Sequence, residues 1–175
     1  MAGAKIIQQD LFMQFKFIEV ELDDADAAAC VTSFEDTGLS IRGNYAMLIH
    51  RVDWNFRLNE ARYETDFALR AALTVDPTVT VQQYMDDIGV IDVMEFNVDY
   101  EVTTSGGLLD HVVKPFTRSY VPPVIICAPK LGIVVSGDGD KADWRSLEIK
   151  CRVGYTTIPI DEKMYLEIAE TWRTL

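Results

Sequence analysis

Positive charge is scarce in this chain. Its 175 residues hold 16 Lys and Arg against 28 Asp and Glu, a formal net charge of −12 at pH 7. Lys5 is the only basic residue among the first ten. Non-specific binding to a nucleic-acid backbone depends on Lys and Arg side chains, which displace counterions from the phosphates. The composition therefore disfavours direct nucleic-acid binding, including binding through a basic N-terminal arm.

Cysteines and long apolar runs are also scarce. The three cysteines, Cys30, Cys127 and Cys151, resemble neither a metal clip nor a disulfide framework in their spacing. Cys151 lies on the apolar phase of a predicted strand, so we expect a buried, reduced thiol. No run reaches the length of a membrane span, and residues 1–10 lack the features of a secretory signal. We expect a soluble chain made in the cytoplasm.

Catalytic and cofactor motifs are missing. There is no GxSxG, P-loop, GxGxxG, HxH or HExxH pattern. His50 shares an apolar phase with Leu48 and Val52 and is predicted to be a hydrogen-bonded structural residue, while His111 is predicted to be a solvated loop residue. A general base is the alternative role for either histidine. The sequence thus predicts no catalytic residue, cofactor or metal.

Acidic clusters are the remaining candidate sites. Asp138, Asp140 and Asp143 place three carboxylates on one turn, which suits calcium. The turn lacks the other ligands and the closing Glu of an EF-hand, so a plain hairpin turn is favoured. Two further acidic groups are predicted to be solvated surface: Asp86 with Asp87, and Asp23 and Asp24 with Asp26.

What the chain does have is a two-residue apolar period, the mark of half-buried strands. The period recurs at residues 48–56, 63–75, 94–102 and 147–155. Residues 46–57 and 62–75 are joined by a short loop, which predicts an antiparallel hairpin. In residues 11–22 the apolar positions change parity after Phe17, which predicts a β-bulge.

About eight strands without strand–helix alternation predict an all-β fold, an antiparallel eight-stranded β-sandwich. A short helix is predicted within residues 80–87. A stronger helical pattern spans residues 161–173, with Asp161 as N-cap and Tyr165, Ile168 and Trp172 on one face. Composition and length fit a single β-sandwich domain over residues 1–175 that ends in this helix.

Three stretches, residues 45–54, 118–129 and 151–172, resemble a small single jelly-roll capsid protein of a tailless icosahedral virus. The resemblance implies a jelly-roll-like sandwich that is a virion structural protein and not an enzyme. It implies assembly with copies of itself, with or without a second capsid protein, into an icosahedral shell. The chain departs from many such proteins in having no basic arm, which fits shells that enclose an internal membrane or use a separate genome-binding protein.

If the chain is a capsid subunit, we expect its contacts with neighbouring subunits to lie in strand edges, in the terminal helix and in apolar segments such as Leu108–Leu109 and residues 121–124. The alternative is a carbohydrate- or ligand-binding sandwich with calcium at Asp138, Asp140 and Asp143, for which a calcium-dependent melting temperature would be evidence. Trp54, Trp144 and Trp172 suit a sugar-binding face, although core or subunit contact explains Trp54 and Trp172 more simply. An enzyme built around His50 or His111 is the third hypothesis.

Overall fold

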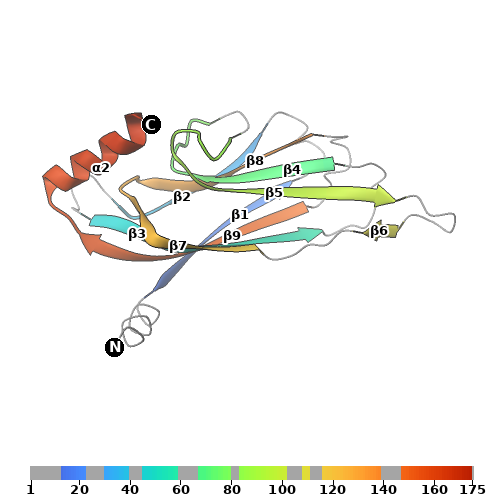
Figure 1. Ribbon diagram of the computed structural model, residues 1–175, viewed down its shortest axis with the longest axis horizontal. Helices are drawn as coiled ribbons and strands as arrows, with labels where there is room; N and C mark the ends of the chain where they lie inside the picture. Colours follow the sequence, from blue (N-terminus) through green and yellow to red (C-terminus); the bar gives the residue numbers. More distant parts are fainter. Residues whose placement is uncertain are drawn as a thin grey trace.

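The computed structural model (Figure 1) describes residues 13–22, 30–39, 45–58, 67–79, 83–101, 108–110, 116–138 and 147–174. These residues form nine strands and one helix: β1 (Gln14–Leu22), β2 (Val31–Asp36), β3 (Tyr45–Leu58), β4 (Phe67–Thr74), β5 (Val90–Glu101), β6 (Leu108–Asp110), β7 (Phe116–Ile126), β8 (Lys130–Asp138), β9 (Leu147–Pro159) and α2 (Glu162–Thr174).

The strands form two sheets that pack face to face (Figure 1). One sheet has the order β1-β9-β3-β7 and the other β2-β8-β4-β5-β6. Every pairing is antiparallel. Without the three-residue β6, this strand order is that of a jelly roll. The predicted antiparallel eight-stranded sandwich is therefore confirmed, with β6 added at the edge beside β5.

The core lies between the sheets and follows the predicted alternation. Each strand turns every second side chain inward. Ile18, Val20 and Leu22 of β1 belong to the same core cluster as the inward side chains of β4 and β8 in the opposite sheet. The inward positions of the central strands, including Trp54, Ile133 and Cys151, are fully buried: Val52, Trp54, Leu69, Ala71, Leu73, Leu131, Ile133, Val135, Ile149, Cys151 and Val153.

The predicted hairpin between residues 46–57 and 62–75 is wrong. Strand β3 pairs with β7 and β9, whereas β4 lies in the opposite sheet and pairs with β5 and β8. Both strands turn apolar side chains toward the same core from opposite sides. A two-residue period records such burial but not the partner strand, so it cannot tell a hairpin from a crossing between sheets.

The predicted β-bulge in β1 is also wrong. Strand β1 runs in unbroken register against β9, and Phe15 and Phe17 lie on its exposed face. A bulge occurs in β3 instead, where the register shifts between Ile49 and Arg51. Because of the shift, the inward side chains of β3 are odd-numbered up to Ile49 and even-numbered from Val52 onward.

Strand β7 runs through two prolines. Its register against β3 jumps from Ser119 to Val124. Pro122 and Pro123 fall within this irregularity at the edge of the sheet, where missing N–H donors are tolerated. Val121 beside them is 96% exposed.

The connection between β4 and β5 lies over the outer face of β4. The helix predicted within residues 80–87 is absent from the described part, residues 83–89, which forms turns. Tyr84 stacks on Arg70, with the guanidinium 4.4 Å from the ring centre. Thr74 Oγ1 donates to the carbonyl of Gly89 over 3.0 Å. Gly89 has a φ of +82°, which explains the residue type at this turn.

Helix α2 lies at one end of the sandwich (Figure 1). The predicted cap is confirmed, because the Asp161 carboxylate accepts the Met164 N–H over 2.7 Å. The predicted inward face is confirmed for Tyr165 and Ile168, which pack on a second cluster that includes Ala46 and Cys127. The Tyr165 hydroxyl donates to the Cys127 carbonyl over 3.3 Å. The side chain of Trp172 lies outside the described residues.

Candidate functional site

His50 lies at the bulge of β3 and is half-buried. Its Nε2 is 2.8 Å from Thr156 Oγ1 on the neighbouring strand β9. The contact joins two adjacent strands where their register shifts, as the structural interpretation of His50 requires. His111, the other candidate general base, lies outside the described residues.

The predicted calcium turn lies outside the described side chains, because only the backbone of Asp138 is described and Asp140 and Asp143 are not. Asp23, Asp24 and Asp26 also lie outside the described residues. Asp87 accepts the backbone N–H of Tyr84 over 2.6 Å within its own turn, and Asp86 is exposed. Among the residues that the structure describes, no three His, Cys, Asp or Glu side chains gather as a metal site.

The cysteines form no disulfide. Cys127 and Cys151 are both buried, which confirms the prediction for Cys151. Burial raises the pKa of both thiols, and the nearby carboxylates of Asp92 and Asp53 raise that of Cys151 further. Both side chains are therefore neutral packing groups and not nucleophiles.

A buried carboxylate that the sequence reasoning missed links the two sheets. Asp92 of β5 is fully buried and points across the sandwich. It accepts the indole N–H of Trp54 on β3 over 2.9 Å and pairs with Arg118 on β7. Burial raises the pKa of Asp92, while the bond from Trp54 and the charge of Arg118 lower it. The available signal was a lone acid inside the apolar run Val90–Met94.

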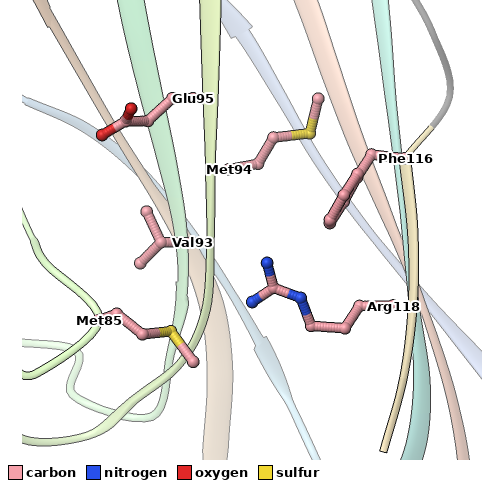
Figure 2. Close-up of a pocket in the computed structure, with 6 residues that line it drawn as sticks. All are labelled: Met85, Val93, Met94, Glu95, Phe116 and Arg118. Atoms are coloured by element: carbon pink, nitrogen blue, oxygen red, sulfur yellow. The ribbon is translucent and has the colours of Figure 1, made fainter.

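An open pocket of about 380 Å³ lies beside this link, between the edge strand β7 and strand β5. Figure 2 shows Arg118 reaching from β7 toward Val93 and Met94 of β5. Met85, Glu95 and Phe116 complete the lining. Because Asp92 neutralises Arg118, this pocket offers mainly apolar contact and is a poor anion site.

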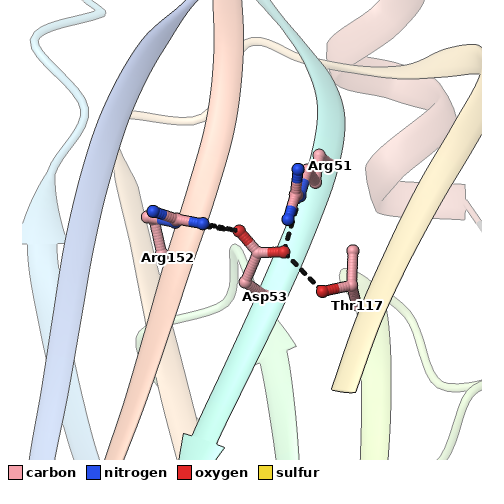
Figure 3. Close-up of polar contacts among 4 residues, drawn as sticks. All are labelled: Arg51, Asp53, Thr117 and Arg152. Carbon is pink, nitrogen blue, oxygen red and sulfur yellow. Dashed lines mark hydrogen bonds and ion pairs between the residues drawn. The ribbon is translucent and has the colours of Figure 1, made fainter. Parts of the chain in front are cut away.

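A polar cluster occupies the outer face of the four-stranded sheet (Figure 3). Asp53 on β3 accepts from Arg51 Nε over 2.6 Å, from Thr117 Oγ1 over 2.7 Å and from Arg152 Nε over 2.8 Å. Partial burial raises the pKa of Asp53, but these three hydrogen bonds outweigh it and hold the pKa below its usual range. Asp53 therefore stays ionised, and two arginines share its single negative charge.

Exposed aromatic side chains flank this cluster on β1. Phe15 is 47% exposed and Phe17 67% exposed. The guanidinium of Arg152 lies 5.2 Å from the ring centre of Phe15. Exposed aromatic and Arg side chains are enriched in protein–protein contacts.

Fold and surface together define a jelly-roll β-sandwich whose interior is filled with side chains. Its distinctive chemistry lies on the outer face of one sheet and along strand edges. Among the described residues, no helix is long and apolar enough to cross a membrane.

No protein-family model and no curated protein matches the chain. Among solved structures, it is similar to a chain from the crystal structure of tomato aspermy virus, with 11% identity and a TM-score of 0.45 over 84% of this chain and 79% of that one. It is also similar to a chain of desmodium yellow mottle tymovirus, with 14% identity and a TM-score of 0.38 over 85% of this chain and 88% of that one. The fold assignment rests on the strand order of the chain itself.

Proposed function

We propose that the chain is a capsid subunit that assembles with copies of itself into a closed icosahedral shell. The observation that carries the proposal is the jelly-roll strand order around a core filled with side chains. Jelly rolls serve as capsid proteins, lectins and cupins. Because one fold hosts several functions, the choice depends on where the chemistry lies.

The described surface favours assembly over ligand binding. A cupin or lectin concentrates its chemistry in a cavity or a metal site, whereas the exposed apolar side chains here are spread over the four-stranded sheet, the connection between β4 and β5, and the helix. They are Phe15, Phe17, Tyr45, Tyr84, Met85, Ile88, Phe116, Val121, Ile125, Met164 and Leu166. Surfaces with apolar side chains at several places suit a subunit that meets several neighbours.

The net charge of −12 shapes the proposed role further. A subunit with this charge is expected to form a shell without binding the genome directly. This fits a shell that encloses an internal membrane or one that uses a separate genome-binding protein. The finished protein would reside in the virion after synthesis in the host cytoplasm.

Mass measurement tests the proposal directly. We expect purified chain to show, by light scattering, a population many times heavier than the 19.8 kDa monomer. Electron microscopy of that fraction is expected to show closed particles of uniform size. A monomer at every concentration and salt level, both alone and with co-expressed coat proteins, would contradict a shell-forming role.

The outward side of α2 is proposed as one of the subunit contacts. Met164 and Leu166 are about half exposed there, while Tyr165 anchors the helix to the sandwich. Leu166→Asp is expected to lower particle yield about tenfold and to leave the melting temperature nearly unchanged, because exposed substitutions alter stability by less than about 0.5 kcal/mol. Yield is measured by sedimentation of assembled material.

Ile88→Asp is the matched control, since Ile88 is also about half exposed but lies in the connection between β4 and β5. Its particles are expected to form normally. Equal yields from the two variants would remove α2 from the set of contacts. Deleting residues 161–175 is a less specific test, because it also uncovers Ala46 and Cys127.

A further inference from the structure

The outer face of the four-stranded sheet is electrically balanced. Among the residues that the structure describes, this face presents four basic and four acidic side chains: Arg51, Arg57, Lys150 and Arg152, and Glu19, Glu21, Asp53 and Glu148. The chain as a whole carries −12. Two copies of a strongly acidic protein repel each other. A face without net charge is where they can approach at the least electrostatic cost.

The two central strands of this face carry opposite charges side by side. Arg152 of β9 lies opposite Asp53 of β3, and Glu148 of β9 lies opposite Arg57 of β3. Consider a two-fold axis that runs parallel to the strands between β9 and β3. It lays β9 of one copy over β3 of a second copy. At each level, the basic side chain of one copy then faces the acidic side chain of the other copy. The two pairs together form a square of four charges that alternate in sign.

The same rotation matches the outer strands in shape. It lays β1 of one copy over β7 of the second copy. The outward side chains of β1 include the exposed rings of Phe15 and Phe17. The outward side chains of β7 at the facing level are the small Thr117 and Ser119, which are exposed. Large side chains on one edge thus meet small ones on the other.

We propose that this face, with its cross-strand charge pairs and the rings of Phe15 and Phe17, is a two-fold contact between two copies of the chain. The inference deepens the proposed function and rests on it, because the contact is small. At ordinary strand spacing the face covers roughly 20 by 20 Å, so two copies bury roughly 800 Å², below the roughly 1,200–2,000 Å² buried in a specific, stable pair. Neighbouring contacts in a shell supply the remaining affinity.

Charge reversal at the outermost pair tests the contact. The Arg57 side chain is largely exposed, and its ion pair with Glu148 is long, at 4.0 Å. Because exposed ion pairs contribute little to stability, replacing Arg57 is expected to have little effect on the fold. Arg57→Glu and Glu148→Arg each place like charges across the proposed axis. Each variant alone is expected to associate at least about tenfold more weakly than the wild type, because facing like charges are strongly unfavourable.

Mixing the two variants distinguishes an effect on contacts between copies from an effect on contacts within one copy. In the mixture, each chain still carries like charges at positions 57 and 148, yet opposite charges meet across the axis between the two different variants. We expect equimolar mixing of Arg57→Glu with Glu148→Arg to restore association to near the wild-type level. The chain that carries both substitutions retains the wild-type net charge and is the matched control, and it is also expected to associate normally.

Association is measured as pairing by sedimentation at high protein concentration and as particle yield. Phe17→Asp is an independent variant, because an exposed side chain can change without unfolding the sheet, and it is expected to weaken both readouts. If Arg57→Glu alone associates normally, or mixing restores nothing, the contact is overturned while wild-type particles still support the proposed function. If mixing restores pairing but the wild type never forms particles, the face stands and the proposed function is overturned.

Discussion

Replacing Asp92 with alanine is expected to lower the free energy of unfolding by about 3 kcal/mol, at the low end for a broken buried ion pair. The carboxylate is fully buried and bonds to Trp54 and Arg118. Its removal leaves the indole N–H of Trp54 without a partner and Arg118 without its counter-charge. Arg118 is partly exposed, so water relieves part of that cost. Denaturant unfolding measures the loss.

Asp92→Asn is the matched comparison and is expected to cost less than Asp92→Ala, because the amide oxygen still accepts the Trp54 N–H although Arg118 loses its counter-charge in both variants. Burial raises the pKa of Asp92 above its ordinary value of 3.8, so the folded chain holds this proton more tightly than the unfolded chain. As pH falls from 7 through the raised pKa, the wild type should therefore gain stability relative to Asp92→Asn. Equal losses in both variants, or a relative loss on acidification, would refute this account.

Replacing Gly132 with alanine is expected to destabilise the fold by about 1–3 kcal/mol, the usual cost of overpacking. A Cβ at this position would lie 2.2 Å from a ring carbon of Phe34 and 2.5 Å from the backbone oxygen of Ser33. The Phe34 ring lies across the glycine on the neighbouring strand. Thermal unfolding followed by circular dichroism measures the change.

Gly154→Ala provides the comparison in a strand of the other sheet. There the nearest atom to a new Cβ is the sulfur of Met13 at 2.7 Å, the end of a flexible side chain that can move aside. Its cost is expected to be under about 1 kcal/mol. Adding Phe34→Ala to Gly132→Ala should rescue only part of the loss, because the Ser33 oxygen remains. Full rescue would show that the ring alone sets the requirement for glycine.

The two-residue period predicted the strands well because burial on one side of a sheet repeats at that interval. Strands β3, β5 and β9 fall close to their predicted segments. The period could not predict that β3 and β4 lie in different sheets, since inward side chains look the same in either arrangement. The bulge was assigned to β1 and not to β3 for a related reason: exposed Phe15 and Phe17 resembled a buried set.

The candidate surfaces were less predictable than the strands. Asp53 and Arg152 are separated by 99 residues in sequence, so their contact follows only from the pairing of β3 with β9. The link from Asp92 to Trp54 requires two strands on opposite sides of the core. Local features fared better, as the cap at Asp161 and the buried thiol of Cys151 show.

The adjacent prolines of β7 also bear on whether a strand of another molecule can add to this edge of the sheet. Successive residues of a strand direct their N–H groups to opposite edges, and neither Pro122 nor Pro123 has one. Another strand that approached the open side of β7 would find the hydrogen-bonding ladder interrupted where Val121 protrudes. Continued growth by addition of strands is therefore disfavoured at this edge of the sheet.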